Sequence, residues 1–310
     1  IIGTSKAIQE AIALAKKAAP TDTTVLLTGE TGTGKEIFAH AIHQESNRSQ
    51  KPFVAINCSA FSKDLLESEM FGYKAGAFTG AGKDKRGLFE EANQGTIFLD
   101  EIGEMDPGLQ AKLLRVLESG EFIKVGESKT TKVNVRIIAA THRNLEEEIE
   151  HGHFREDLFY RISAFRIKLP PLRERTADIE LLVHYFISHF QSTTKTVKVT
   201  FEDHFLDLLK LHSWKGNIRE LKNVIERSLI LMENNLLRID YLPLEIQQLA
   251  IAFTPVDAEK QLSAFSLAAA EKLHIQKIMN YTQGNKTEAA RLLNIAITTL
   301  YRKLEEYHIS

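Results

Sequence analysis

A glycine-rich run follows the first apolar stretch of the chain and ends in a lysine. Its residues are Gly29, Glu30, Thr31, Gly32, Thr33, Gly34 and Lys35, and a helical pattern begins directly after them. Glycines let backbone N–H groups curve around phosphate oxygens, and a helix N-terminus adds positive charge there. The run predicts a phosphate-binding loop in which Lys35 contacts the β- and γ-phosphates of a nucleotide. A glycine-rich turn without a ligand is the alternative, and the position of the run between strand and helix argues against it.

Two acidic residues end a later apolar run, Thr96-Ile97-Phe98-Leu99-Asp100-Glu101. A carboxylate at the carboxyl end of a parallel strand faces the crevice where ligands bind. We expect Asp100 to hold Mg²⁺, directly or through water, and Glu101 to orient and polarise the attacking water. Two acids at a strand end are also common in a plain solvated turn. The phosphate-binding loop earlier in the chain favours the nucleotide interpretation.

Short β-branched runs that alternate with helical stretches must position these residues. This alternation is typical of a parallel sheet with crossover helices, an α/β fold. The predicted strands are nearly continuously apolar, as buried parallel strands should be. They are Thr24–Thr28, Phe53–Asn57, Thr96–Asp100, Arg136–Thr141 and Phe165–Leu169. Pro170 and Pro171 end the sheet region, because neither can donate a hydrogen bond to a neighbouring strand.

The second half of the chain has helical periodicity. One apolar stripe is formed by Leu181, Leu182, Tyr185 and Phe186, and another by Phe205, Leu208, Leu209 and Leu211. They predict a small helical domain from Asp178 to about Met232. A stretch from about residue 248 to 261 includes Thr254-Pro255 and lacks periodicity, which indicates a linker. From there to the end the pattern is helical again.

Composition restricts the class of protein. The 310 residues exceed what one core usually serves, so two or three domains are expected. A net charge of −2 means that any nucleic-acid surface must be local. The single cysteine, Cys58, suits a reducing cytosol, and no apolar run approaches the roughly 20 residues that span a bilayer. The opening Ile1-Ile2-Gly3 lacks a signal peptide and suggests the interior of a longer protein with a regulatory domain before it.

The run Gly76-Ala77-Phe78-Thr79-Gly80-Ala81 resembles the signature loop of bacterial enhancer-binding proteins, the AAA+ activators of sigma-54 RNA polymerase. Four further blocks match in order: GETGTGKE at 29–36, EMFGY at 69–73, GTIFLDEI at 95–102 and LPPLRER at 169–175. The general phosphate-loop pattern has Ser or Thr where Glu36 stands, but this family also carries Glu there. The resemblance extends from Ile1 to about Leu244.

The resemblance assigns the signature loop, Gly76 to Ala81, to sigma-54 binding, with Phe78 and Thr79 in contact. Glycines at both ends would act as hinges, and an exposed aromatic residue on a mobile loop usually marks a binding site. A plain surface turn with Phe78 tucked into the core is the alternative.

The resemblance also implies roles in the nucleotide site. Asn57 is similar to the switch asparagine that hydrogen-bonds the catalytic glutamate, here Glu101. Thr141 and His142 correspond to the first sensor, and Arg219, in the run WKGNIREL, to the second sensor on a helical lid. Ile2 and Gly3 fall where adenine packs. The family usually has proline where Lys215 stands, so a looser turn is expected before Arg219.

Arg155 and Arg161 resemble the arginine fingers of the family. A finger from the neighbouring subunit stabilises charge that builds on the transferred phosphoryl group. Outside the family context, either arginine would more often form a surface ion pair.

A helix-turn-helix pattern closes the sequence. Asn285 can cap a helix with Glu288 three residues on, and Asn294 suits a left-handed turn before a second helix from about Ile297 to Tyr307. Four basic residues against one acid give residues 284–304 a local charge of +3. The segment resembles a Fis-type DNA-binding domain, with its second helix in the major groove.

The candidate DNA contacts are Lys286, Thr298, Thr299, Tyr301, Arg302 and Lys303. Ala296 stands where the family usually has a capping Ser or Asn, and Ile297 where a basic residue is common, so DNA affinity or the site that is read is expected to differ. A dimerising helical bundle without a DNA role is the alternative.

The sequence therefore predicts an AAA+ P-loop NTPase with a parallel five-stranded sheet and a helical lid, followed by an all-α helix-turn-helix domain. The expected boundaries are 1–170, 171–247, a linker at 248–262, and 263–310. We expect a cytoplasmic, ATP- and Mg²⁺-dependent activator that forms a hexameric or heptameric ring, rests as a dimer, and binds sigma-54 polymerase and upstream DNA. A DNA-binding regulator whose ATPase fold serves only assembly, and a generic AAA+ remodeller or helicase, are the alternatives.

Overall fold

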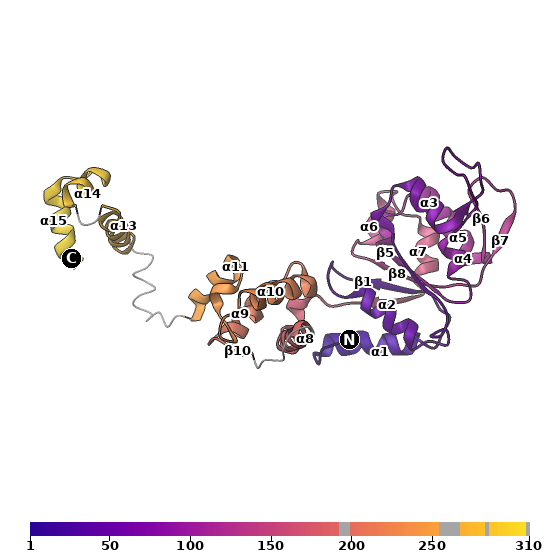
Figure 1. Cartoon of the computed structure of the whole chain (residues 1–310), viewed down its shortest axis with the longest axis horizontal. Helices are drawn as coiled ribbons and strands as arrows, with labels where there is room; N and C mark the ends of the chain where they lie inside the picture. Colours follow the sequence, from indigo (N-terminus) through magenta and orange to yellow (C-terminus); the bar gives the residue numbers. More distant parts are fainter. Residues whose placement is uncertain (192–198, 254–266, 283–284, 308–310) are drawn as a thin grey trace. The chain divides into compact units, whose positions relative to one another are not determined.

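A parallel sheet forms the centre of the first of two compact units. The computed structural model describes residues 1–191, 199–253, 267–282 and 285–307. The units are Ile1–Leu249 and Ala250–Ser310. The sheet has the strand order β2-β5-β8-β1-β9, and every pair of neighbouring strands in it is parallel. Figure 1 labels its three central strands, β5, β8 and β1. Its strands are β1 (Val25–Thr28), β2 (Phe53–Asn57), β5 (Thr96–Asp100), β8 (Arg136–Thr141) and β9 (Phe165–Lys168). The predicted α/β class and all five strands are confirmed to within one residue at each end.

Alternate residues of the central strands face two separate apolar cores. Ile137 and Ala139 of β8 pack in one core, whereas Ile138 and Ala140 pack in the other. This is the period-2 geometry of a strand that is buried on both faces, and it explains the continuous apolar runs in the sequence. The edge strands β2 and β9 are only partly buried, so the expectation of buried strands holds for β1, β5 and β8 alone.

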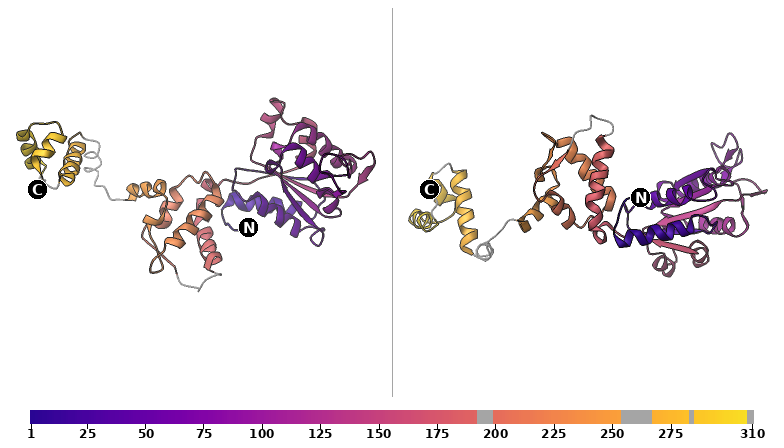
Figure 2. Two further views of the ribbon diagram at one scale, coloured as in Figure 1. Left: turned by 45° about the horizontal axis from the view of Figure 1, so that its top comes forward. Right: turned by 90° about the horizontal axis from the view of Figure 1, so that it is seen from below.

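Helices cover both faces of the sheet (Figure 2). α1 and α2 supply one core, and α3, α5 and α7 supply residues to the other. The helices are α1 (Lys6–Ala18), α2 (Lys35–Gln44), α3 (Lys63–Phe71), α4 (Leu88–Glu91), α5 (Pro107–Ser119), α6 (Leu145–Glu150) and α7 (Glu156–Ile162). Two short antiparallel pairs, β3 (Gly72–Tyr73) with β4 (Lys85–Arg86) and β6 (Glu121–Ile123) with β7 (Thr130–Lys132), were not expected from the sequence.

A helical lid completes the first unit. It contains α8 (Ile179–Gln191), α9 (Phe205–Leu211), α10 (Asn217–Leu231), α11 (Leu244–Gln247) and the short strands β10 (Thr200–Phe201) and β11 (Leu236–Leu237). The buried face of α8 is formed by Ile179, Leu182, Val183, Phe186 and Ile187. The two apolar stripes lie on α8 and α9, but three of their residues, Leu181, Tyr185 and Leu211, are exposed. Leu182 and Phe186, and the other three residues of the second stripe, are buried.

A buried ion pair joins the chain start to the segment that enters the lid. Arg175 Nε lies 2.9 Å from Asp178 Oδ2, and both side chains are almost fully buried. Asp178 also accepts hydrogen bonds from the Thr4 and Ser5 amides and the Ser5 hydroxyl. Burial by itself would raise the pKa of Asp178, but these hydrogen bonds and the arginine charge leave it below its usual value.

The second unit contains α13 (Leu267–Tyr281), α14 (Lys286–Leu292) and α15 (Ile297–Glu306). Asn285 Oδ1 accepts a hydrogen bond from the Glu288 amide, and Asn294 has a φ of 54°, so the predicted cap and left-handed turn are confirmed. Ala296 provides no side-chain cap to α15. Most of the predicted linker, residues 254–262, lies outside the described residues. In the described part of the chain, every helix is too short or too polar to span a bilayer.

The buried pair predicts a stability loss that depends on pH. Asp178→Asn leaves Arg175 buried without its counter-charge, so the free energy of unfolding at pH 7 should fall by about 3–5 kcal/mol. Because the folded pKa of Asp178 is lowered, its contribution is present above about pH 4 and is lost as pH falls through the folded pKa. Urea unfolding of both proteins at several pH values measures the difference, which should narrow in acid.

Glu180→Gln is the matched control, because Glu180 pairs with Lys210 on the surface of the lid at 3.0 Å. Exposed pairs contribute less than about 1 kcal/mol. Equal losses in the two variants would contradict the assignment of Asp178 as a buried anchor.

Candidate functional site

The phosphate-binding loop lies between β1 and α2, as predicted. Its lysine is folded back in this structure: Lys35 Nζ donates to the carbonyls of Gly29 at 2.8 Å and Glu30 at 3.3 Å. Thr33 is buried and its hydroxyl donates to the Glu30 carbonyl. Gly34 caps the N-terminus of α2 with a φ of 99°. The loop and Lys35 therefore lie together at the N-terminus of α2, where the positive end of the helix dipole favours an anion.

Opposite charges meet beside this loop. Lys35 Nζ lies 3.9 Å from Glu101 Oε1, and Asp100 Oδ1 accepts a hydrogen bond from the Glu101 amide at 3.1 Å. Burial lowers the pKa of Lys35, although Glu101 and Asp100 oppose that effect. Burial and the Glu101 charge raise the pKa of Asp100, and Lys35 offsets part of the rise. Lys35, Asp100 and Glu101 therefore share a partly buried site, where electrostatic interactions are stronger than in bulk water.

A cavity of about 650 Å³ opens at the carboxyl ends of β5 and β8. That volume is in the range of small-molecule sites. The predicted residues that line it are Thr31, Gly32, Gly34, Lys35, Glu36, Asn57, Asp100, Glu101, His142 and Arg219. Sequence reasoning missed the other lining residues, which are Ile37, Ser59, Glu104, Tyr185, Phe186, His189, Ile218 and Lys222. Six of these come from neighbouring turns of α8, α10 and α2 that only tertiary packing brings together.

Glu101 is held by the first-sensor histidine instead of by Asn57. Its Oε2 lies 2.7 Å from His142 Nδ1 and accepts from the His142 amide at 3.2 Å. Asn57 accepts hydrogen bonds from the amide and hydroxyl of Ser59, and the structure shows none between Asn57 and Glu101. The expected Asn57–Glu101 bond is therefore absent here, because Asn57 caps the short helix at Cys58–Ala60.

Six predicted nucleotide residues do not line the cavity, namely Ile2, Gly3, Gly29, Glu30, Thr33 and Thr141. Thr141 is buried and its hydroxyl accepts from the Arg143 amide, so its side chain points away from the site. Ile2 and Gly3 lie beside Arg175, whose guanidinium donates to the Ile2 carbonyl at 2.6 Å. Glu30 also lies outside the lining, because its carboxylate pairs with Arg173.

The two candidate arginine fingers, Arg155 and Arg161, make contacts at the surface of their own chain. Arg155 pairs with Asp157 at 2.7 Å, and Arg161 donates to the Leu117 carbonyl at 2.8 Å. Neither arginine lines the cavity of its own chain. Both contacts lie in exposed surroundings.

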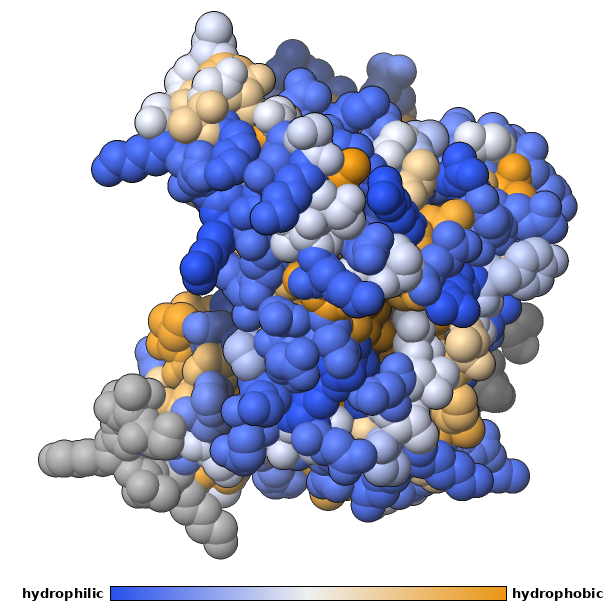
Figure 3. Space-filling model, turned by 90° about the vertical axis from the view of Figure 1, so that its right-hand side faces the viewer, coloured by the Kyte–Doolittle hydropathy of each residue, from blue (hydrophilic) through white to orange (hydrophobic). Residues whose placement is uncertain are grey.

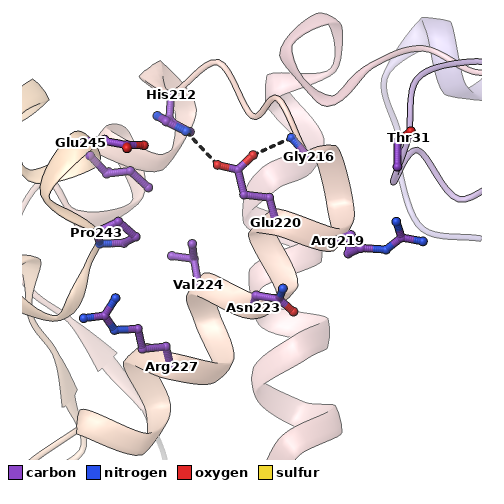
Figure 4. Close-up of a pocket in the computed structure, with 11 residues that line it drawn as sticks. Thr31, His212, Gly216, Arg219, Glu220, Asn223, Val224, Arg227, Pro243 and Glu245 are labelled. Carbon is purple, nitrogen blue, oxygen red and sulfur yellow. Dashed lines mark hydrogen bonds and ion pairs between the residues drawn. The ribbon is translucent and has the colours of Figure 1, made fainter. Parts of the chain in front are cut away.

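Arg219 projects from the first turn of α10, at the border of two cavities. Beside the nucleotide cavity lies a second one of about 420 Å³, which Thr31 and Arg219 also line (Figure 4). Figure 4 shows the Arg219 side chain extended toward the Thr31 side, while Glu220 holds the turn before α10. Glu220 accepts from the Gly216 amide at 2.7 Å and lies 3.1 Å from His212 Nε2. Both contacts stabilise the turn that precedes α10, and the looser turn expected from Lys215 stays a prediction.

The signature loop projects from the β3–β4 pair. The Gly76 amide donates to the Ala81 carbonyl at 2.8 Å, and Lys74 pairs with Asp84 at the base. Phe78 is 46% exposed, and its ring forms a T-shaped pair with Tyr73, with centroids 4.9 Å apart. Figure 3 shows one face of the molecule, where hydrophilic residues predominate and apolar residues form small separate patches. Because 46% of the Phe78 side chain is exposed, this residue lies outside the core, and the alternative with a buried Phe78 is excluded.

The DNA candidates divide into two groups. Thr298, Tyr301 and Arg302 are exposed, and Lys286 lies 5.0 Å from the centroid of the Tyr301 ring. Thr299 is half-buried. Lys303 turns inward: its ammonium lies 2.7 Å from Glu271 and contacts the Tyr307 hydroxyl, which raises its pKa. Lys303 therefore joins α15 to α13 in this structure.

The sheet, the loop with Lys35, the acids at the end of β5 and the lid together define a AAA+ ATPase. Family models match the chain in three consecutive segments: the Sigma-54 interaction domain at residues 1–168, the AAA+ ATPase lid domain at 173–255, and the Bacterial regulatory protein, Fis family, at 266–307. The chain belongs to the sigma-54-dependent transcriptional activators.

Relatives of known function agree with this assignment. The transcriptional regulatory protein ZraR of Salmonella typhimurium is 45% identical over 304 residues, which are 98% of this chain and 68% of that protein. The regulatory protein AtoC of Escherichia coli is 43% identical over 314 residues and covers the whole chain, again with 68% of its own length. The Nif-specific regulatory protein of Azotobacter vinelandii is 48% identical over 244 residues, 79% of this chain and 47% of that protein.

A solved structure extends the comparison to ligands. NtrX from Brucella abortus in complex with ATP aligns with a TM-score of 0.75 and 34% identity, over 100% of this chain and 69% of that one. The same protein has been solved with ADP, at a TM-score of 0.75. This chain is accordingly a nucleotide-binding ATPase with sigma-54 and DNA as the classes of partner that its domains bind.

Close packing at the loop makes one glycine indispensable. A Cβ at Gly32 would lie 2.2 Å from the Gly216 carbonyl oxygen, and its φ of +81° disfavours any other residue. Gly32→Ala should therefore push the lid off the loop at a cost of about 1–3 kcal/mol and weaken nucleotide binding by about tenfold. Titration with a fluorescent ATP analogue and thermal unfolding measure both effects.

Gly82→Ala is the control for this substitution, because a Cβ there meets nothing within 4 Å. Wild-type nucleotide affinity in the Gly32 variant would contradict the close approach of lid and loop.

Proposed function

We propose that the protein hydrolyses ATP between adjacent copies of a ring and uses the energy to move its signature loop. The loop engages sigma-54 and remodels the polymerase to the open complex. One observation carries the proposal. A cavity with Lys35, Asp100 and Glu101 lies on the same α/β scaffold as a projecting loop that exposes Phe78.

The roles within the cavity follow from charge and position. Lys35 and the loop amides neutralise the phosphates, and the Glu101 carboxylate accepts a proton from the attacking water. The His142 contact holds Glu101 before ATP arrives. Across residues 1–191, 199–253, 267–282 and 285–307, no three His, Cys, Asp or Glu side chains form a metal cluster. Mg²⁺ normally uses one or two carboxylates plus phosphates, and the half-buried Asp100 fits as that carboxylate.

The arginines act on a neighbouring copy. Arg155 and Arg161 do not line their own cavity and hold only exposed contacts, which supports a role in trans. A positive charge from the neighbour would offset negative charge on the transferred phosphoryl group, and would make hydrolysis depend on assembly. We infer a hexameric or heptameric ring that forms from a resting dimer.

The C-terminal unit tethers the ring to upstream, enhancer-type DNA. Lys286, Thr298, Thr299, Tyr301 and Arg302 would contact DNA, and Lys303 would support α15 from within. Tethering raises the local concentration of the activator at the promoter. We assign the boundaries 1–170, 171–247, 248–262 and 263–310 to the ATPase subdomain, the lid, the linker and the helix-turn-helix domain.

A DNA-binding regulator whose ATPase fold serves only for assembly is the second candidate. The acids that line the cavity, Asp100 and Glu101, favour hydrolysis instead, because assembly alone requires no group to activate water.

The exposed aromatic residue separates energy production from its use. Phe78→Ala should retain ATP turnover within about twofold of wild type, because Phe78 is not among the residues that line the cavity. Open-complex formation on a sigma-54 promoter should fall by at least about tenfold. An aromatic side chain that becomes buried against a binding partner contributes more than about 1.4 kcal/mol to the binding free energy. Promoter opening is measured with permanganate footprints.

Two variants bracket this result. Phe61→Ala removes a similarly exposed ring outside the loop and should leave promoter opening unchanged. Glu101→Gln should bind ATP but lose turnover and opening together. Full promoter opening by the Phe78 variant would refute the proposed contact, and turnover by the Glu101 variant would refute its role as the base.

Neighbouring basic residues on α15 should differ in their effect on DNA. Arg302 is exposed, whereas Lys303 is committed to Glu271. Arg302→Ala should reduce the slope of log affinity against log salt by about 1, the loss of one phosphate contact. Lys303→Ala should leave that slope unchanged and lower the melting temperature of the C-terminal unit. Fluorescence anisotropy across a salt series tests both, and equal slope losses would show that Lys303 also reaches DNA.

A further inference from the structure

An ion pair outside the nucleotide cavity connects the phosphate-binding loop to the lid. Arg173 donates to both carboxylate oxygens of Glu30, at 2.8 and 2.6 Å. Glu30 is the second residue of the loop, and Arg173 lies in the segment that enters the lid. Two parallel N–H···O bonds fix direction as well as distance. The pair therefore restricts how the loop and this segment move against each other.

Asn217 joins the same carboxylate to a third segment. Its side-chain amide donates to Glu30 Oε2 at 3.2 Å and to the Thr31 carbonyl at 3.0 Å. Its Oδ1 accepts from the Leu172 amide at 2.7 Å. Asn217 is fully buried and holds a φ of +53°, a conformation that asparagine tolerates better than most residues. We call Glu30, Arg173 and Asn217 the loop–lid junction.

Main-chain contacts place the first turn of α10 on the loop itself. The Ile218 amide donates to the Gly32 carbonyl at 3.0 Å. Arg219 follows Ile218 directly, so the direction in which it leaves the helix depends on this contact. Glu220 then secures the preceding turn through Gly216 and His212, as Figure 4 shows. The position of Arg219 at the nucleotide cavity therefore follows from the main-chain contact between Ile218 and Gly32 and from Asn217 of the junction, which begins the same helix.

Hydrogen bonds from Arg173 and Asn217 lower the pKa of Glu30 to about 2. The carboxylate therefore remains charged throughout the physiological pH range, so the junction does not act as a pH switch. Glu30 and Arg173 are 43% and 46% exposed, and pairs with that exposure add little to global stability. A pair that contributes little to folding can still decide between two positions of a lid.

We propose that Glu30 is a positioning residue, which holds the lid so that Arg219 can distinguish ATP from ADP. This inference rests on the proposed role of Arg219 as the second sensor. The loop senses the phosphates directly, and Glu30 transmits its conformation to Arg173 and Asn217. Loss of the Glu30 charge would free the lid, and Arg219 would then contact the terminal phosphate for a smaller fraction of the time.

Nucleotide discrimination is the property to measure. The experiment compares the dissociation constants of a non-hydrolysable ATP analogue and of ADP for the full chain. Glu30→Gln should reduce the preference for the ATP analogue by about five- to tenfold, a typical size for coupling between sites. Arg219→Ala should reduce it at least as much. The double variant Glu30→Gln/Arg219→Ala should show no further loss, because both substitutions remove the same interaction.

The reciprocal exchange Glu30→Lys/Arg173→Glu restores opposite charges and should recover part of the preference. Glu180→Gln, which breaks an ion pair of similar exposure elsewhere on the lid, is the control and should leave the preference unchanged.

Two results would overturn the inference. One is an unchanged ATP/ADP preference in Glu30→Gln, and the other is a multiplicative loss in the double variant. If Arg219→Ala alone leaves the preference unchanged, the second-sensor role fails. A loss in Glu30→Gln would then have to act without Arg219, which contradicts the route proposed here. Since binding alone is measured, the outcome is independent of hydrolysis and of sigma-54.

Discussion

Direct packing of the lid on the phosphate-binding loop is the constraint on which the rest of the structure depends. At Gly32 the two backbones approach so closely that no side chain fits between loop and lid. The Ile218 amide hydrogen-bonds the Gly32 carbonyl across this contact. A ligand that changes the conformation of the loop must therefore move the lid, or pay to separate the two. Rigid coupling of this kind lets a small change at a phosphate become a larger movement of a helical domain.

The sheet supplies the fixed side of that arrangement. Both faces of β1, β5 and β8 are buried, so the ends of these strands have little freedom. Asp100 and Glu101 lie at the end of β5, Lys35 begins α2 after the loop that follows β1, and the His142 contact orients Glu101 from the end of the neighbouring strand. The signature loop and the lid are attached outside the sheet. A rigid sheet with the loop and the lid attached outside it suits the proposed function, in which ATP hydrolysis at one site moves a loop at another.

Charged side chains outside the cavity differ in how deeply they are buried. Arg155, Arg161 and Arg173 are each held by surface contacts, which cost little to break. Arg175 and Asp178, in contrast, form a buried pair that anchors the start of the chain to the segment before the lid. The ion pairs of the ATPase unit therefore differ in burial, with the Arg175–Asp178 pair almost fully buried and the Arg155 and Arg173 pairs about half exposed.

Local patterns in the sequence determined the strands, the phosphate-binding loop, the acids at the end of β5 and the turn at Asn294, because each depends on neighbours in the chain. The strand boundaries were predicted from continuous apolar runs, and the phosphate-binding loop was predicted from the spacing of its glycines. The chain order did not reveal that Asn57 caps a short helix, that Thr141 turns inward, or that Lys303 pairs with Glu271. It also did not reveal the Glu30–Arg173 contact between residues 143 positions apart. Each of these side chains has several possible hydrogen-bond partners, and only the packed tertiary structure determines which of them lies within hydrogen-bond distance.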